Sequence, residues 1–318
     1  MEKRSLGNTG LLVSPVGMGV LTVGRTQLDL PLDAGAALIR YALSRGINFL
    51  DTAEYYETYP YIQAALKGGG YAPVIASKSL AHSYEKMGKA IEDCRAAFGR
   101  DAIDIFLLHE VRQAPDLENR AGAWQALIDA KAKGRVKAIG LSTHHADVAA
   151  LCAGLPGLDV LFPLINFKSL GIREGENAGT KEAMAGAIRA AAAAGKGVFA
   201  MKVFGGGNLS GDYVEALDYV TGLPGIDSVM IGMGSEKDVD DAVDYFEGRL
   251  PEGYRPDVSQ KTLRVDRGDC EGCGKCARHC PSRSITLDAE NIAVIDPANC
   301  LTCGYCAYAC PVRAIILI

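Results

Sequence analysis

The amino-acid sequence contains no apolar run as long as the roughly 18 residues that a membrane-spanning helix requires, so no such helix is predicted. It also has no block of basic residues: 33 Lys and Arg stand against 38 Asp and Glu, and the formal net charge is −5. A nucleic-acid partner therefore has no electrostatic support. The first residues lead into no long apolar segment of the kind found in signal peptides, which favours a cytoplasmic protein.

Cysteine is scarce in most of the chain and concentrated in one part of it. The first 258 residues contain only Cys94 and Cys152, whereas eight cysteines lie between Cys270 and Cys310. Such a concentration occurs either in the disulfide framework of a secreted domain or in a metal site. Because the sequence shows no secretion signal, metal binding is the better interpretation. Cys94 and Cys152 are expected to be buried, unreactive side chains.

The spacing of the eight cysteines favours iron–sulfur clusters. The two runs at 270–280 and 300–310 both follow C-x2-C-x2-C-x3-C, and proline follows each of them. This pattern resembles that of bacterial ferredoxins with two [4Fe–4S] clusters, in which the fourth cysteine of each run binds the other cluster. The alternative is a pair of zinc sites, but these usually separate two C-x2-C pairs and need no repeated triplet. The expected ligand sets are Cys270, Cys273, Cys276 and Cys310 for one cluster, and Cys300, Cys303, Cys306 and Cys280 for the other.

The segment around the cysteines is interpreted as a separate small domain. Segments 284–287 and 314–317 follow the two runs at equal offsets and are interpreted as paired strands of an internally duplicated fold. Proline and glycine within 250–256 indicate a linker. We therefore expect a first domain at 1–258 and a small α+β dicluster ferredoxin-like domain at 259–318.

The first domain is expected to be an α/β barrel. Short apolar runs alternate with helical patterns, and eight such units in about 250 residues fit a (β/α)8 TIM barrel. A doubly wound open sheet is the alternative, but it requires an early G-x-G-x-x-G motif, and Gly17 and Gly19 lack the third glycine. The expected strands are 16–18, 47–50, 74–77, 103–108, 138–142, 160–164, 198–203 and 228–231. The expected helices include 33–44, 84–98, 122–133, 181–194 and 235–246.

Polar side chains follow three adjacent strands of this predicted barrel. Asp51 and Tyr56 come after the second strand, Lys78 follows the third, and His109 follows the fourth. The C-terminal ends of barrel strands meet at one rim, where the catalytic residues of such barrels lie. Each residue alone has an ordinary structural explanation, but together they predict one catalytic site.

These residues lie in stretches that resemble the aldo-keto reductase family. The stretches are 4–10 (RSLGNTG), 46–53 (GINFLDTA), 77–78, 104–109 and 138–142 (AIGLS), and the resemblance covers residues 4–248. It implies that Tyr56 protonates a carbonyl oxygen as hydride reaches the carbon. Lys78, paired with Asp51, is then expected to lower the pKa of Tyr56, and His109 to orient the substrate oxygen.

The resemblance also implies a nicotinamide dinucleotide, NADP(H) or NAD(H), bound across the top of the barrel. Ser235 begins a capping-box pattern, and the helix N-terminus that it predicts can bind an anion. However, Lys237 stands among four carboxylates, and Coulomb repulsion opposes a 2′-phosphate there. The positions that match cofactor contacts are Ser142, Thr143, Met201, Lys202, Gly206, Gly207, Ser235 and Lys237.

Three functions follow from these patterns. The first is an oxidoreductase that interconverts a small-molecule carbonyl and alcohol and carries a fused electron-transfer module. Hydride transfer moves two electrons together, whereas an iron–sulfur cluster exchanges one at a time. The second hypothesis is therefore a nicotinamide-independent redox enzyme that an external ferredoxin or flavodoxin supplies through the clusters. The third is an electron-transfer subunit or redox sensor with an idle barrel.

Overall fold

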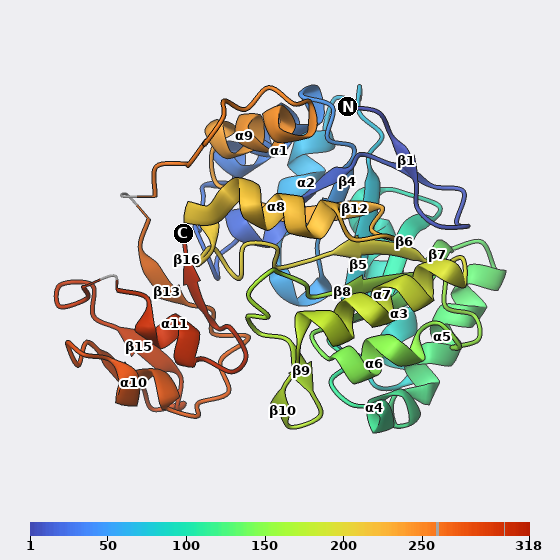
Figure 1. Cartoon of the computed structure of the whole chain (residues 1–318). Helices are drawn as coiled ribbons and strands as arrows, with labels where there is room; N and C mark the ends of the chain where they lie inside the picture. The colour runs from blue at the N-terminus through green and yellow to red at the C-terminus, as the bar shows by residue number, and fades with distance from the viewer. Residues whose placement is uncertain (259–260, 302) are drawn as a thin grey trace.

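The computed structural model describes residues 1–258, 261–301 and 303–318. Eight parallel strands close into a barrel in the order β11-β12-β3-β4-β5-β6-β7-β8, so the predicted TIM barrel is confirmed (Figure 1). Parallel barrel strands are covered on both faces, which explains why they are short apolar runs without polar alternation. The barrel strands are β3 (Val16–Gly19), β4 (Phe49–Asp51), β5 (Val74–Ser79), β6 (Ile103–Leu108), β7 (Val136–Thr143), β8 (Val160–Pro163), β11 (Gly197–Ala200) and β12 (Ser228–Gly232).

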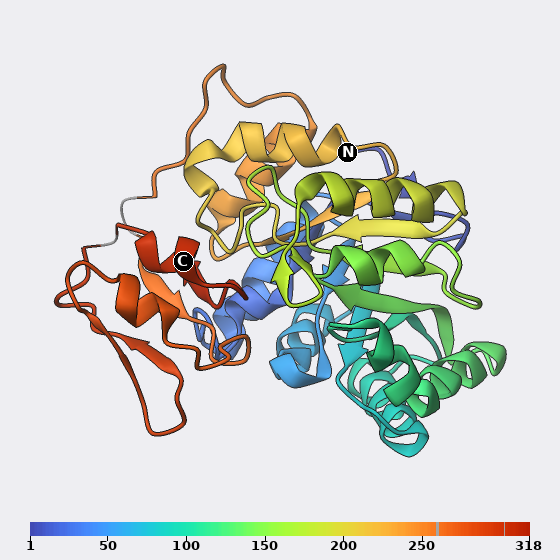
Figure 2. The ribbon, with the colours of Figure 1, turned by 60° about the horizontal axis from the view of Figure 1, so that its bottom comes forward.

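Helices cover the outside of the barrel (Figures 1 and 2). The local sequence sets their ends: α3 (Tyr84–Phe98) begins after Ser83, whose side chain accepts a hydrogen bond from the Lys86 N–H, and it ends at the left-handed Gly99. Its bounds are those predicted. The other helices of the first domain are α1 (Leu32–Ser44), α2 (Tyr59–Leu66), α4 (Ala114–Asn119), α5 (Ala121–Ala132), α6 (Ala146–Leu151), α7 (Lys181–Ala193), α8 (Tyr213–Thr221) and α9 (Glu236–Phe246). In the part of the chain that the structure describes, no helix has the length and apolarity needed to cross a membrane.

Shorter elements complete the first domain and were not predicted. Two small antiparallel pairs lie outside the barrel, and three single turns of 3-10 helix follow barrel strands or precede a helix. These elements are β1 (Arg4–Ser5) with β2 (Leu12–Val13), β9 (Arg173–Glu174) with β10 (Asn177–Ala178), and the turns η1 (Val20–Val23), η2 (Glu54–Tyr56) and η3 (Ser210–Asp212).

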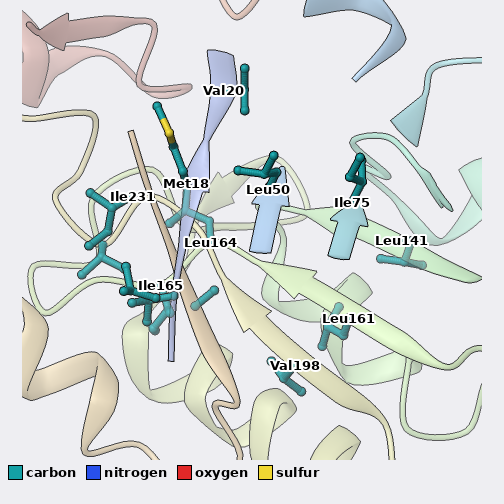
Figure 3. Packing of buried hydrophobic residues seen from close by; sticks show 14 of the residues in the cluster. Met18, Val20, Leu50, Ile75, Leu141, Leu161, Leu164, Ile165, Val198 and Ile231 are labelled. Atoms are coloured by element: carbon teal, nitrogen blue, oxygen red, sulfur yellow. The ribbon is translucent and has the colours of Figure 1, made fainter. Parts of the chain in front are cut away.

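Two apolar layers hold the barrel together. Inside it, the rings of Phe162 and Phe199 stack with their centroids 4.2 Å apart, next to Phe49. Between the strands and the helices lies a larger cluster that includes Leu50 and Ile75 (Figure 3). Successive residues of a strand face opposite sides, so Phe49 joins the inner layer and Leu50 the outer one. The two layers fix the strands rigidly and leave their C-terminal ends to carry polar side chains.

Gly140 lies in β7 where the neighbouring strand leaves no space for a side chain. A Cβ atom at this position would lie 1.9 Å from the carbonyl oxygen of Val160. We expect Gly140→Ala to lower the free energy of unfolding by about 1–3 kcal/mol or more, because the strands must shift. Gly88 in α3 faces open space, so Gly88→Ala is a matched control; it should raise stability by about 0.5–1 kcal/mol. Denaturant unfolding measures both, and an unchanged Gly140→Ala protein would contradict this close approach.

The described residues of the second domain, 261–301 and 303–318, form two antiparallel strand pairs and two short helices. Strand β13 (Leu263–Val265) pairs with β16 (Ile315–Leu317), and β14 (Ile285–Leu287) pairs with β15 (Ala293–Ile295). Segments 284–287 and 314–317 thus form strands, but the expectation that they pair with one another is wrong. Each pairs with a strand that precedes a cysteine run, so every pair takes one strand from each half of the duplication. The helices α10 (Lys275–His279) and α11 (Tyr305–Ala309) lie within the two cysteine runs.

The second domain packs against the barrel rim formed by the C-terminal ends of the strands (Figures 1 and 2). The predicted domain boundary, between residues 258 and 259, borders residues 259–260, which lie outside the described residues. The contacts between the domains include Leu317 N–H to Gly206 O (2.9 Å), Arg264 Nη1 to Gln27 O (2.9 Å), and the ion pairs of Lys202 with Asp269 (3.3 Å) and Arg112 with Glu271 (3.0 Å). The second domain therefore closes over the rim at which catalytic residues were predicted.

Candidate active site

A cavity of about 570 Å³ lies between the barrel rim and the second domain, and we call it the chamber. Its wall includes Lys202 from the barrel, and Asp269 and Leu317 from the second domain. The structure brings all four predicted catalytic residues to this chamber. These residues are Asp51, Tyr56, Lys78 and His109.

Lys78 and Asp51 form a buried ion pair in the chamber. Lys78 Nζ lies 2.7 and 2.9 Å from the two carboxylate oxygens of Asp51 and 2.8 Å from the carbonyl oxygen of Thr52. The pair forms because β4 and β5 are neighbours: Asp51 is in register with Ala76, two residues before Lys78 and on the same strand face. Burial raises the pKa of Asp51 and lowers that of Lys78, while the opposite charge of each partner counteracts the shift. The ion pair therefore fixes the position of the Lys78 amine.

Lys78→Met is expected to lower the free energy of unfolding by about 3–5 kcal/mol, because it leaves the Asp51 carboxylate buried without its partner. The double variant Lys78→Met/Asp51→Leu removes both charges and should recover most of this loss. Denaturant unfolding of the two variants measures the difference. A single variant as stable as the double variant would show that Asp51 does not depend on Lys78.

Tyr56 comes from the η2 turn that follows β4. Its hydroxyl oxygen lies 3.4 Å from Nε2 of His109, and Lys78 Nζ lies 4.7 Å from the centre of its ring. The expectation that Lys78 lowers the pKa of Tyr56 is wrong for this structure. Burial, followed by the charges of carboxylates that include Asp51 and Asp269, raises the pKa of Tyr56 well above its ordinary value. The Tyr56 hydroxyl therefore keeps its proton at neutral pH.

His109 is held as a neutral imidazole. Burial, and then the nearby positive charge of Lys78, lower its pKa well below the ordinary value. Its Nδ1 atom is buried and has no hydrogen-bond partner among the described residues. The buried Arg120 donates from Nη1 to the carbonyl oxygen of His109 (2.8 Å) and from Nη2 to that of Ser79 (2.9 Å). Sequence reasoning missed Arg120, because it lies between α4 and α5 and no motif marks it.

Lys202 connects the barrel to the first cysteine run. Its φ of 58° is in the left-handed region, which is unfavourable for a residue with a side chain and is common at functional sites. Its amine lies 3.3 Å from a carboxylate oxygen of Asp269, the residue before Cys270. Burial alone would lower the pKa of Lys202, but the charges of Asp269 and Asp266 outweigh it and raise this pKa. Asp269 was not predicted, because no sequence pattern links it to the barrel.

The residues expected to contact a nicotinamide dinucleotide are not all at the chamber. Thr143 is fully buried outside it, and its hydroxyl donates to the carbonyl oxygen of Val111 (2.6 Å). The hydroxyl oxygen of Ser142 accepts the N–H of Glu110 (2.8 Å). The expected contacts that do line the chamber are Ser142, Met201, Lys202, Gly206, Gly207, Ser235 and Lys237.

Strand β16 covers the glycine loop at 205–207. The N–H of Leu317 donates to the carbonyl oxygen of Gly206, and the side chain of Asn208 donates to the carbonyl oxygen of Ile315 (3.0 Å). A Cβ atom at Gly207 would lie 2.1 Å from the carbonyl oxygen of Leu317. The loop that would lie beside a pyrophosphate is thus in close contact with the protein's own backbone.

Helix α9 has internal partners for the groups that would bind a phosphate. Ser235 and Asp238 form the predicted capping box, and Asp238 accepts the N–H groups of Gly234 (2.9 Å) and Ser235 (3.0 Å). Lys237 donates to both carboxylate oxygens of Asp241 (2.8 and 3.0 Å). As these residues are arranged, the chamber does not fit a dinucleotide.

The cysteines of the two runs are grouped across the duplication. The pKa of Cys306 is raised to about 11, first by burial and then by the neighbouring thiols Cys300, Cys276 and Cys280, which come from both runs. The N–H groups of Ser284 and Ala314 approach Cys280 Sγ and Cys310 Sγ, each at 3.3 Å, and hydrogen bonds of this kind accompany iron–sulfur ligands. A small cavity is lined by Cys270, Cys273, Cys276 and Cys310.

The two cysteine runs supply eight thiols, the number of ligands that two [4Fe–4S] clusters require. Within residues 1–258, 261–301 and 303–318, no three His, Cys, Asp or Glu side chains are close enough to hold one ion together. In a [4Fe–4S] cluster each thiolate binds a different iron, so its ligands stand farther apart than those of a single ion. The donor set and its N–H···S contacts fit such a group.

Barrels of this kind carry their chemistry at the rim, and cysteine runs of this spacing carry electrons. The fold and the site therefore define a class, a TIM-barrel oxidoreductase with a ferredoxin-like domain. The model described as the aldo/keto reductase family matches residues 15–224, more than half of the chain, and the chain belongs to this family. A second model, described as a 4Fe-4S dicluster domain, matches residues 260–314.

Individual relatives match only about half of the chain, at about 30% sequence identity. The 6-dehydroglucose reductase of Novosphingobium aromaticivorans is 32% identical over 176 residues, which cover 46% of this chain and 54% of that protein. The L-galactose dehydrogenase of Arabidopsis thaliana is 28% identical over 162 residues, 46% of this chain and 50% of that protein. The chain thus spans about half the length of the curated relatives it matches.

Solved structures of other proteins have the same barrel fold as this chain. An aldo-keto reductase structure from Pseudomonas aeruginosa has a TM-score of 0.66 at 25% identity, and the match covers 78% of this chain and 96% of that one. The holo form of aldo-keto reductase AKR11C1 from Bacillus halodurans has a TM-score of 0.63 at 19% identity, with coverages of 82% and 94%. The second likeness supports the fold alone.

Proposed function

We propose that the chain reduces an uncharged carbonyl compound to an alcohol in the chamber, or catalyses the reverse oxidation. The observation that carries the proposal is the contact between the Tyr56 hydroxyl and His109 beside the buried Lys78–Asp51 pair. Tyr56 donates its proton to the carbonyl oxygen as reducing equivalents reach the carbon. His109 Nε2 orients that oxygen. Lys78, held by Asp51, places a positive charge near the oxygen as negative charge develops on it.

The charge of the chamber supports a substrate without negative charge. Seven carboxylates and four lysines of the described residues line it. Lys78 and Lys202 are each paired with a carboxylate, so Coulomb repulsion opposes an anionic substrate. The names of two relatives refer to hexoses, 6-dehydroglucose and L-galactose. We therefore propose an uncharged, sugar-like carbonyl or alcohol.

The second domain is proposed to hold two [4Fe–4S] clusters, which supply one-electron transfer when bound. The cavity that Cys310 shares with the first run supports the ligand sets Cys270, Cys273, Cys276 and Cys310, and Cys300, Cys303, Cys306 and Cys280. We retain the domain division 1–258 and 259–318, and a cytoplasmic location, where thiols stay reduced. No nucleic-acid or membrane partner is proposed.

Anaerobic turnover of the cluster-loaded chain tests this function. A panel of uncharged aldehydes, ketones and hexoses is offered with NADPH, NADH and reduced methyl viologen as separate reductants. We expect conversion between carbonyl and alcohol with at least one reductant. No conversion with any reductant across the panel would contradict the proposal and favour an electron-transfer subunit with an idle barrel.

A further inference from the structure

We propose that strand β16 takes the place of a dinucleotide on the glycine loop, and that reducing electrons enter the chamber through the iron–sulfur domain from an external one-electron carrier protein. This inference rests on the proposed carbonyl–alcohol function and deepens it by naming the reductant. The second domain would then both cover the loop and supply the electrons.

Strand β16 is an integral part of the second domain. All three of its residues pair with β13, and Ile315 and Ile316 are only 1% and 2% exposed. Gly206 faces the side chain of Ile316, and Gly207 faces the carbonyl oxygen of Leu317. A pyrophosphate could reach the loop only if β16 separated from it. Such a separation would break the hydrogen bonds to Gly206 and from Asn208 and expose buried apolar surface.

The electrostatics of the chamber also oppose the binding of a dinucleotide. A pyrophosphate carries two negative charges, and the chamber already has more carboxylates than lysines. At the start of α9, the Asp238 carboxylate accepts the N–H groups that a phosphate would need. Lys237 is bound to Asp241 and to the hydroxyl of Tyr254 (2.9 Å). The N–H groups at the start of α9 and the Lys237 amine thus already have partners within the chain.

Carbonyl reduction without a nicotinamide needs a separate source for each electron and each proton. The carbonyl π bond is replaced by one C–H bond and one O–H bond, which requires two electrons and two protons. Tyr56 supplies the proton on oxygen, and water supplies the proton on carbon. Two molecules of reduced carrier, such as a ferredoxin or flavodoxin, each lose one electron per turnover. Because each [4Fe–4S] cluster exchanges one electron, two clusters match the two electrons required.

The position of the two cysteine runs indicates a direction for the electrons. Cys270 follows Asp269, which contacts Lys202 at the chamber wall. Each run has one cysteine exposed to solvent, Cys273 in the first run and Cys303 in the other, so the large side chains around Cys303 carry the assignment. Three large side chains of the same stretch are also exposed: Leu301 (69%), Tyr305 (63%) and Tyr308 (58%). Exposed apolar patches mark interaction sites, so we assign this stretch as the face that receives the carrier protein.

Dinucleotide binding to the anaerobic, cluster-loaded chain tests the role of β16. We expect calorimetry to show that neither NADH nor NADPH binds with a Kd below about 1 mM. A chain that ends at Ile316 lacks the Leu317 contacts, and we expect it to bind NADH at least about tenfold more tightly than the parent. Val294→Ala, an exposed substitution in β15, is the control and should leave binding unchanged.

Tight binding of either nucleotide to the parent chain would overturn the proposal. If the shortened chain keeps its cluster absorbance but gains no NADH binding, β16 is not the obstacle and the proposal also fails. Should the shortened chain not fold, amide hydrogen exchange of the parent chain provides the second test. Residues 315–318 should exchange at the same rate with and without about 5 mM NADH. Faster exchange with NADH would show that the nucleotide displaces β16 and would overturn the inference.

The two proposals fail in different ways. Turnover driven by NADPH or NADH but not by reduced methyl viologen would overturn the electron route and leave the carbonyl–alcohol function intact. The absence of turnover with every reductant, together with the expected lack of nucleotide binding, would overturn the function while supporting the role of β16.

Discussion

Tyr56→Phe is expected to lower kcat for carbonyl reduction by about 10²–10⁴-fold, the usual contribution of a general acid, with little change in KM. The substitution removes one oxygen atom and leaves the ring in place against His109 and Lys78. The raised pKa of Tyr56 keeps its hydroxyl protonated at neutral pH, and this hydroxyl is the proton donor that we propose. Initial rates with reduced methyl viologen and with NADPH measure the effect whichever reductant the enzyme uses.

The matched control is Tyr84→Phe. It removes the hydroxyl of a tyrosine in α3 that bonds to Asp129 at the protein surface. We expect this variant to keep kcat within about twofold of the parent, as surface substitutions usually do. If Tyr56→Phe retained more than about a tenth of the parent kcat, the proton would have to come from another group.

The barrel and the polar side chains at its rim could be predicted from the sequence because both depend on local patterns. A buried parallel strand is a short apolar run, and the residue that ends it reaches the rim, so Asp51, Lys78 and His109 could be placed at one site. The start of α9 was predicted for the same reason, since Ser235 and Asp238 are three residues apart and form a capping box.

The features that distinguish this chamber depend on contacts between distant segments. Nothing in the local sequence indicates that Leu317 bonds to Gly206, or that Asp269 contacts Lys202. The pKa of Tyr56 was predicted in the wrong direction because burial, the largest cause, raises it, and carboxylates from both domains raise it further. The pairing of the second-domain strands was also missed. The internal duplication indicates where the strands lie along the chain, but it does not indicate which strands pair.

Two double variants test the crossed cysteine sets. Cys270→Ser/Cys310→Ser removes two ligands of one proposed cluster, so the iron content should fall from about eight to about four atoms per chain. Cys270→Ser/Cys280→Ser removes one ligand from each cluster, and most of the iron should then be lost. Both variants remove two thiolates from the same domain, so each is the control for the other. Iron analysis and electron paramagnetic resonance of the reduced protein measure the outcome.

If each run held its own cluster, these two results would be exchanged. The structure favours the crossed sets because Cys310 lines the same small cavity as Cys270 and Cys276. Cys94→Ala provides a further control. Cys94 is buried in α3, outside the second domain, so its loss should leave the iron content unchanged.

Crossed ligands also place the two proposed clusters in order between solvent and substrate. The cluster at Cys270 lies next to Asp269 and hence to Lys202, whereas the run of the other cluster carries the exposed side chains Leu301, Tyr305 and Tyr308. Cys270→Ser/Cys310→Ser should therefore keep a cluster that the carrier protein reduces, yet lose carbonyl reduction although Tyr56 is intact. Continued reduction of the carbonyl by this variant would show that electrons reach the chamber without the cluster beside Asp269.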